Sequence, residues 1–172
     1  WPAPSVTACI VLTFGAINGL YFARLMPPVP LALKSAGIYH HVVRTPTGYQ
    51  AKYVPPPSYR FWKDWDDPFY LSPGDAVFCY TAIFAPQKIR VPVFHIWSRK
   101  TNQGWTKTDR IRFEISGGRR AGYRGYTVKR GCVPGKWRVE IQTEEGHILG
   151  KVEFRIVPST EDRPPLKTKW FR

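Results

Sequence analysis

Short runs of β-branched and aromatic residues dominate the chain from Gly37 onward, and clusters of Gly, Pro, Asp and Ser separate them. Runs of this length and composition are typical of strands bounded by turns. We therefore predict strands over residues 38–44, 50–54, 76–84, 91–98, 110–115, 123–129, 137–143 and 148–157. About seven or eight such strands indicate a mainly β fold, an antiparallel β-sandwich of immunoglobulin-like or similar kind over residues 37–158.

Alternation between apolar and polar side chains supports two of these strands. Every second residue from Val91 to Trp97 would face the same side of its strand. In the run from Lys136 to Ile141, the apolar residues would face one side and the charged residues the other. Glu144-Glu145-Gly146 then predicts a tight turn between the last two strands.

Two segments interrupt this pattern. The connection from Val54 to Pro68 is rich in proline and aromatic residues. We expect an ordered loop there, because aromatic rings are costly to leave in water. Residues 159–172 carry charge and two adjacent prolines without periodicity, so we expect a loosely held basic tail.

The N-terminal stretch has a different character. No charged residue occurs from Ala3 to Ala23, where most residues are apolar, and Arg24 follows. About 20 such residues is the length that crosses the hydrocarbon core of a bilayer. Residues 1–24 therefore predict one transmembrane helix, the end of a longer membrane region. The alternative is a helix buried in a protein core, for which the rest of the sequence offers no helical partners.

A proline-rich neck is predicted over residues 25–36, because Pro27, Pro28 and Pro30 prevent the helix from continuing. Basic residues follow the apolar stretch and none precedes it, which by itself favours a cytoplasmic C-terminal part. Long domains cross membranes largely regardless of charge, however. The charge pattern therefore leaves the side of the membrane open.

The chain is strongly basic, with 26 Lys and Arg against 12 Asp and Glu among 172 residues, a formal charge of +14. Such a charge attracts phosphates, anionic lipids and acidic glycans without choosing among them. Its aromatic content of 15% and charged fraction of 22% exclude the composition of a disordered chain.

Cysteines and histidines form no metal or redox motif. Cys79 and Cys132 could be bridged, but we expect free thiols because neither belongs to a Cys-x-x-Cys or Cys/His pattern. The histidines show no short ligand spacing and no carboxylate cluster completes a ligand set. We therefore expect no metal and no cofactor.

The best candidate for binding is the block from Gly117 to Tyr126, in which Arg, Tyr and Gly alternate. Guanidinium groups bind phosphate or carboxylate as planar forks, and tyrosine rings offer a surface on which a sugar or base can stack. In the alternative interpretation, the glycines set a bulge or turn and the tyrosines pack across strands. The candidate binding residues are Arg119, Arg120, Tyr123, Arg124, Tyr126 and Arg138.

Candidates for chemistry are few. His95 and Trp97 share a strand face, although a core histidine beside a core tryptophan is the simpler interpretation. Asp64, Asp66 and Asp67 form an acidic cluster, and paired carboxylates serve glycoside hydrolysis when held at the right separation. The sequence carries no nucleophile elbow, P-loop or dinucleotide fingerprint. We therefore predict no enzyme and assign no catalytic residue.

An ordered series of motifs runs along the chain. It comprises Pro27-Pro28-Val29-Pro30-Leu31, Gly37-Ile38-Tyr39-His40, Phe84-Ala85-Pro86, His95-Ile96-Trp97, Gly117-Gly118-Arg119 and Gly135-Lys136-Trp137-Arg138-Val139. The series resembles the bacterial membrane proteins that end in domain of unknown function 2914, over nearly the whole chain. The resemblance implies further membrane helices upstream and a small β-fold displayed from the bilayer. That family has no assigned activity, so no catalytic residue follows from the resemblance.

These observations predict a membrane-anchored, non-enzymatic β-domain that acts as a binding or interaction module in the bacterial cell envelope. Residues 3–23 would contact the lipid bilayer, which we expect to be the bacterial inner membrane with the β-domain on its periplasmic side. The basic domain would bind an anionic lipid, an envelope polysaccharide or another membrane protein, and a membrane tether disfavours nucleic acid. Two alternatives stay open: a hydrolase acting on envelope glycan or lipid, and a structural cap for upstream membrane helices.

Overall fold

The computed structural model describes residues 3–23, 31–56, 63–85, 90–116, 123–159 and 164–171. The chain divides into two compact units, residues 1–30 and residues 31–172. The elements in chain order are α1 (Ala3–Phe22), β1 (Ala32–Tyr39), β2 (His41–Thr45), β3 (Gly48–Tyr53), β4 (Phe69–Leu71), β5 (Val77–Phe84), β6 (Arg90–Thr101), β7 (Gly104–Ser116), β8 (Tyr123–Lys129), β9 (Gly135–Thr143), β10 (Ile148–Pro158) and β11 (Lys167–Phe171).

The first unit contains α1, which forms where the apolar stretch predicts a helix. Glycines and uncharged polar residues interrupt its apolar residues, and the Asn18 amide donates to the Phe14 carbonyl oxygen (2.8 Å). The described part of the chain contains no helix whose length and hydrophobicity together would suffice to cross a bilayer. The predicted helix is therefore present, but the predicted membrane span is not supported.

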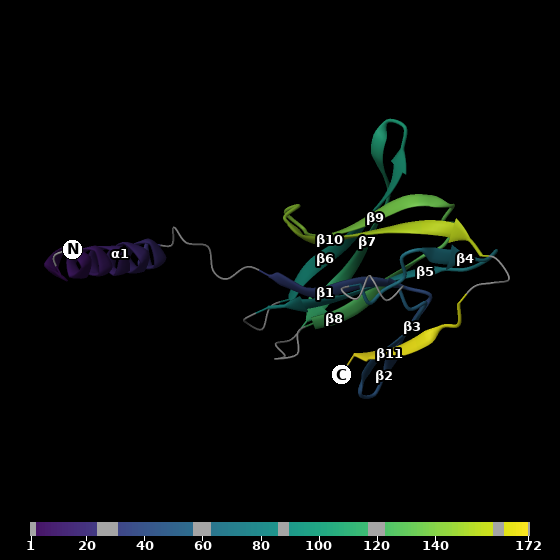
Figure 1. The fold of residues 1–172 in the computed structure, drawn as a ribbon, viewed down its shortest axis with the longest axis horizontal. Coiled ribbons are helices and arrows are strands. Elements are labelled where there is room, and N and C mark those ends of the chain that lie inside the picture. Colours follow the sequence, from purple (N-terminus) through teal and green to yellow (C-terminus); the bar gives the residue numbers. More distant parts are fainter. Residues whose placement is uncertain are drawn as a thin grey trace. The chain divides into compact units, whose positions relative to one another are not determined.

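The described residues of the second unit form three sheets (Figure 1). A five-stranded sheet has the order β4-β10-β9-β6-β7, and a three-stranded sheet has the order β1-β5-β8. Apolar side chains from both sheets form one core, which includes Ile38, Val77, Cys79, Ile83, Val93, Trp97, Trp137, Val139, Ile141, Val152 and Phe154. The predicted mainly β fold with a sandwich core is thus confirmed. Strand β4 pairs with β10 in parallel, whereas the other pairings described are antiparallel.

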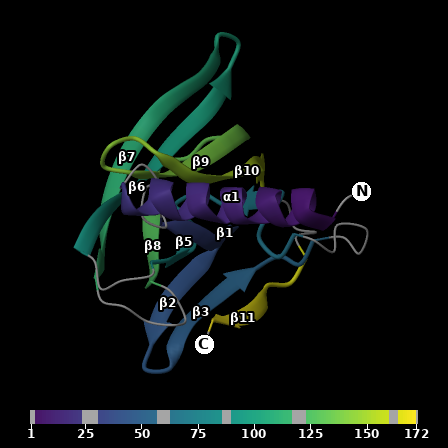
Figure 2. The ribbon, with the colours of Figure 1, turned by 90° about the vertical axis from the view of Figure 1, so that its left-hand side faces the viewer.

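A second three-stranded sheet, of order β11-β3-β2, adds a third layer that the sequence did not predict. Figure 2 shows it on the side of β1-β5-β8 away from the five-stranded sheet. A separate buried cluster of Tyr39, Val42, Ala51, Tyr80 and Ala82 fills the space between these layers. Strand β5 is consequently buried on both faces.

The C-terminal strand differs from the loose tail predicted for residues 159–172. Residues 167–171 form β11, which pairs antiparallel with β3. Phe171 explains the order, because its ring stacks on Tyr80 (4.1 Å between centroids) and meets Tyr39 edge-on (5.8 Å). Residues 160–163 of this tail lie outside the described residues.

Strand boundaries also differ from prediction in the N-terminal part of the domain. Strand β1 begins at Ala32, so residues 32–36 of the predicted neck belong to the sheet, whereas residues 25–30 lie outside the described residues. The single strand predicted over residues 38–44 is two strands, β1 and β2, which meet at His40. The predicted turn at Glu144–Gly146 is confirmed: Gly146 has a φ of 86° and its N–H donates to the Thr143 carbonyl oxygen (3.1 Å).

Candidate functional site

The predicted binding residues of the Arg/Tyr block do not share one surface. Arg119 and Arg120 lie outside the described residues. Tyr123 is buried in the sandwich core, whereas Arg124 and Tyr126 face the third layer. The Arg124 guanidinium donates to the Phe171 carbonyl oxygen (3.0 Å), so it helps to hold β11.

Tyr126 takes part in the aromatic packing of the third layer. Its ring lies edge-on to Tyr49 (6.2 Å between centroids) and tilted against Phe78 (5.9 Å). The Tyr49 hydroxyl donates to the Arg124 carbonyl oxygen (3.0 Å). These contacts match the cross-strand packing that the sequence left open as an alternative for this block.

His95 and Trp97 occupy the core between the five-stranded sheet and the β1-β5-β8 sheet, and both are fully buried. The His95 ring nitrogens lie 2.7 Å from the Thr127 hydroxyl and 3.2 Å from the Thr81 hydroxyl. Burial lowers the pKa of His95 to about 3. The ring is therefore neutral at physiological pH and ties β6 to β5 and β8.

The outer face of the five-stranded sheet is strongly basic. Along β9 and β10 the apolar residues turn into the core, so the charged residues between them face outward. The pairings of β6 with β7 and β9 continue this alternation across the sheet. We call this surface the basic face; its described charged residues are Lys100, Lys107, Arg110, Arg112, Lys136, Arg138, Lys151 and Arg155, together with Glu140 and Glu153. It therefore carries an excess of six positive charges.

Aromatic rings on the basic face lie under guanidinium groups. Arg138, which the sequence predicted as a binding residue, lies over the Trp105 ring (4.0 Å) and pairs with Glu153 (2.7 Å). Arg110 lies over Phe94 (3.7 Å). Such cation–π contacts hold the guanidinium planes in place while leaving their N–H groups available.

A groove of about 560 Å³ opens on the basic face. One wall comes from the connection that precedes β4, and the rest comes from β6, β7, β9 and β10. Its charged and aromatic lining residues are Lys63, Asp67, Lys100, Trp105, Lys136, Trp137, Arg138, Glu153, Phe154 and Arg155. The lining therefore combines the Trp105 ring with an excess of three positive charges, whereas Trp137 and Phe154 are almost fully buried in the core.

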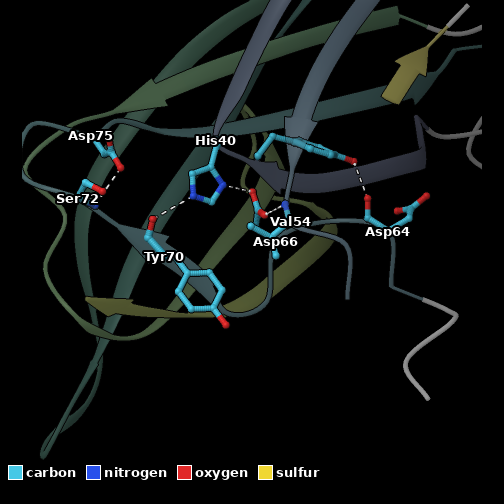
Figure 3. Close-up of polar contacts among 8 residues, drawn as sticks. His40, Val54, Asp64, Asp66, Tyr70, Ser72 and Asp75 are labelled. Carbon is cyan, nitrogen blue, oxygen red and sulfur yellow. Dashed lines mark hydrogen bonds and ion pairs between the residues drawn. The ribbon is translucent and has the colours of Figure 1, made fainter. Parts of the chain in front are cut away.

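A buried polar site lies where the 63–68 connection crosses β1 and β4 (Figure 3). Asp66 is fully buried, and its carboxylate meets His40 Nδ1 (2.8 Å) and accepts the Val54 N–H (2.6 Å). His40 Nε2 donates to the Tyr70 carbonyl oxygen (3.0 Å), and the ring stacks on Phe69 (4.1 Å). Burial raises the pKa of Asp66, although its hydrogen bond with His40 opposes that shift. Both ring nitrogens are engaged, so this pair serves as a structural link.

The other two acidic residues of the predicted cluster have different partners. Asp67 pairs with Lys63 and accepts the Arg155 N–H (3.1 Å). Asp64 is exposed and pairs with Lys169 on β11. The three carboxylates therefore serve three separate contacts and do not converge on one cavity.

The cysteines in the core are free, as the sequence predicted. Burial raises the pKa of Cys79 and raises the pKa of Cys132 to about 11. Both are therefore protonated thiols at neutral pH rather than reactive thiolates. Among the described residues, no group of three or more His, Cys, Asp and Glu is placed to hold a metal ion.

The sequence revealed only part of the basic face. Alternation along residues 136–141 placed Arg138 and its charged neighbours on one side of a strand, and the structure agrees. Lys100 was missed because β6 comes next to β9 only through long-range pairing. Arg155 was missed although its strand, β10, follows β9 through the turn at residues 144–146. Charges at alternate positions in β10, at Lys151, Glu153 and Arg155, are the signal that could have found Arg155.

Among the solved structures that show distant similarity are two from Pseudomonas species. An immunoglobulin-like protein from Pseudomonas aeruginosa is 10% identical with a TM-score of 0.42, and the alignment covers 77% of this chain and 100% of that chain. An alkylpurine DNA glycosylase from Pseudomonas fluorescens, bound to DNA containing an abasic site analog, is 15% identical with a TM-score of 0.34. That alignment covers 70% of this chain and 30% of the glycosylase. Neither similarity bears on function, and no match was found among curated proteins.

One protein family matches the core of the domain. The matched segment begins in β6 and ends in β10, so it includes the strands of the basic face. The motifs His95-Ile96-Trp97 and Gly135-Lys136-Trp137-Arg138-Val139 fall within it. Residues 91–156 match the family described as protein of unknown function (DUF2914), which confirms over this segment the family that the motifs predicted.

Proposed function

We propose that the β-domain is a non-enzymatic interaction module that binds an anionic partner through the basic face. The observation that carries this proposal is the concentration, among the described side chains, of eight Lys and Arg against two Glu on the outer side of four adjacent strands. The strands are paired along most of their length, so the charges are displayed on a rigid support. A rigid array of like charges attracts an extended anionic surface over long range.

The contacts on this face leave much of the charge without a carboxylate partner. Glu153 pairs with Arg138 (2.7 Å) and lies 3.8 Å from Lys151. Lys100, Lys107 and Arg110 have no ion pair within the described part of the chain. An anionic partner would offset this local repulsion, which supports binding here rather than a purely solvated surface.

The hydrolase alternative receives less support from the geometry. Asp64, Asp66 and His95 are the residues of the sequence that could serve as acid or base in such an enzyme. Asp66 and His95 are buried with their polar atoms engaged inside the protein, and Asp64 is paired with Lys169 on another side of the domain. General acid–base catalysis requires such groups to reach one substrate together.

Attachment to a lipid bilayer through residues 3–23 and a periplasmic position at the bacterial inner membrane stay predictions. The role as a structural cap for upstream helices stays a prediction as well. The proposal of an anionic partner depends on neither, because the basic face belongs to residues 31–172. Anionic lipids and envelope polysaccharides are the partner classes that we would test first.

A binding assay at two salt concentrations tests the proposal. The full chain would be mixed with vesicles that contain phosphatidylglycerol, with neutral phosphatidylcholine vesicles, and with an anionic polysaccharide. We expect binding to an anionic partner at about 0.1 M salt and a large loss at about 1 M, where the screening length falls from about 10 Å to about 3 Å. Binding that ignores salt and lipid charge would contradict the proposal.

A matched pair of variants locates the surface. Lys107→Gln, Arg110→Gln and Lys151→Gln together remove three charges from the basic face. The control replaces three exposed cations on other strands, Lys34, Arg44 and Lys52, with Gln. We expect the first variant to lose most of the salt-sensitive binding and the control to keep it; equal losses would show that net charge, not this face, is responsible.

A further inference from the structure

Three cations stand side by side in the groove of the basic face. Arg155 on β10 is directly opposite Lys136 on β9. Lys136 precedes Trp137, whose partner on β6 is Arg99, the residue before Lys100. Arg155, Lys136 and Lys100 therefore follow one another across three adjacent strands, and all three line the groove. We call them the cation row.

The neighbouring cation Arg138 has a carboxylate opposite it on the next strand, whereas the cation row has none among the described residues. One step along the strands, Arg138 is opposite Glu153 and pairs with it at 2.7 Å. Within the described residues, no member of the cation row makes an ion pair. Like charges placed directly opposite each other across strands are destabilising. The fold therefore retains an unfavourable arrangement at the point where the surface is hollowed.

Among the described residues, the two acidic residues that line the groove, Asp67 and Glu153, both have cationic partners outside the cation row. Asp67 lines the groove, but Lys63 neutralises its charge and the Arg155 N–H occupies one of its oxygens. A bound anion would thus meet three cations without displacing an existing ion pair. Trp105 and Pro68 form apolar parts of the wall, which fits a ligand whose charged group is carried on a larger body.

We propose that the cation row is a subsite for a phosphate monoester, the charged group of a phosphorylated partner. A carboxylate or phosphodiester brings one negative charge, whereas a phosphate monoester brings about 1.5 to 2 at neutral pH and three acceptor oxygens. Three convergent cations match the larger charge. This inference rests on the proposed function and adds selectivity to it: the basic face attracts anions in general, and the groove distinguishes the monoester.

Vesicles of two compositions test this selectivity on the full chain. One contains phosphatidylcholine with phosphatidic acid, which exposes a phosphate monoester. The other contains phosphatidylcholine with enough phosphatidylglycerol, a phosphodiester, to give the same surface potential. We expect at least fivefold tighter binding to the monoester vesicles. Any contribution from α1 is common to both compositions, so it does not affect this ratio.

Two triple variants with the same change in charge assign the effect to the groove. Lys100→Gln, Lys136→Gln and Arg155→Gln remove the cation row, and Lys107→Gln, Arg110→Gln and Lys151→Gln remove charges elsewhere on the face. The first variant should bind both vesicles about equally, whereas the second should bind more weakly to both and keep the fivefold ratio. Equal ratios in the two variants would overturn the proposal.

A titration without vesicles shows whether the subsite binds free phosphate or only the phosphate of a lipid headgroup. Inorganic phosphate would be titrated into the isotopically labelled chain while the Trp105 indole N–H signal is followed by NMR. A shift in the millimolar range that is abolished by loss of the cation row supports the subsite for phosphate itself. Monoester selectivity with no such shift restricts the ligand to the headgroup.

The outcomes distinguish failure of this inference from failure of the proposed function. Salt-sensitive binding to both vesicles without preference for the monoester would overturn the subsite and leave the interaction module standing. Absence of binding to either vesicle, to polysaccharide and to inorganic phosphate would overturn both.

Discussion

His95 makes a quantitative prediction about acid stability. Its ring is fully buried, and the Phe113 ring lies against it (4.5 Å between centroids). Among the residues that the structure describes, the His95 nitrogens contact only the hydroxyls of Thr81 and Thr127. No carboxylate is among these contacts. Burial consequently lowers the pKa of His95 to about 3, from about 6.5 in the unfolded chain.

The sign and size of the effect follow from proton linkage. Below pH of about 6.5 the unfolded chain takes up a proton that the folded chain does not, so the free energy of unfolding falls as the pH drops. The slope approaches about 1.4 kcal/mol per pH unit and ends near the folded pKa. Between pH 7.5 and pH 5, His95 alone should reduce the stability by about 2 kcal/mol.

Urea unfolding at a series of pH values would measure this loss, with His95→Gln as the control. The glutamine amide can still bond to both threonine hydroxyls but does not titrate. Between pH 7.5 and pH 5, the free energy of unfolding of the variant should therefore fall by about 2 kcal/mol less than that of the unsubstituted protein. The difference between the two curves cancels the carboxylates common to both proteins. Parallel curves would refute the reasoning, as would an NMR titration of the folded protein that shows the His95 ring gaining a proton near pH 6.

Three further predictions concern stability measured by urea unfolding. Asp66→Ala leaves the Val54 N–H and His40 Nδ1 without a partner, so it should lower the free energy of unfolding by about 3–5 kcal/mol. In Asp66→Asn the amide can bond to both groups, so the loss should be less than half as large. Equal losses in the two variants would contradict this account of the site. Phe171→Ala should cost about 2–3 kcal/mol because it removes a partly buried ring from Tyr80, whereas Trp170→Ala, at a ring that is 52% exposed, should cost little; the reverse order would argue against β11 being held by Phe171. Gly37→Ala places a methyl group 2.7 Å from the Tyr39 hydroxyl and 2.9 Å from Trp65 Cβ, so the free energy of unfolding should fall by about 1–3 kcal/mol. An unchanged unfolding midpoint would show that this packing is looser than described.

The local pattern of the sequence was enough to predict the strands of the sandwich. Runs such as Val77–Phe84 and Gly135–Thr143 carry β-branched and aromatic residues between clear turn signals. The third layer escaped prediction because β11 has only five residues, with Lys at two of them, and its order comes from contacts with β3 and the aromatic cluster. Contacts between segments so far apart in the chain leave no periodic mark in either segment.

The sequence indicated that a basic surface exists and that Arg138 and its charged neighbours belong to it, but it did not indicate the residues of the candidate site on other strands. The charge of the chain and the alternation around Arg138 indicated a basic surface, but not which strands build it. That depends on the register of β9 with β6 and β10, which places Lys136 beside Arg155 and next to Lys100. Density of Arg and Tyr in the 117–126 block was a weaker guide, because Tyr123 and Tyr126 face opposite sides of β8 and both pack inside the domain.

The double burial of β5 affects how its register is specified. In a strand with one wet face, a shift by one residue exposes apolar side chains to water, which makes the shift costly. In β5 the same shift would exchange two apolar sets, because Cys79 and Ile83 face one cluster and Tyr80 and Ala82 face the other. Thr81 breaks this symmetry, since only the observed register brings its hydroxyl to His95. A single polar contact in the core therefore selects one alignment of a strand whose hydrophobic pattern would accept two.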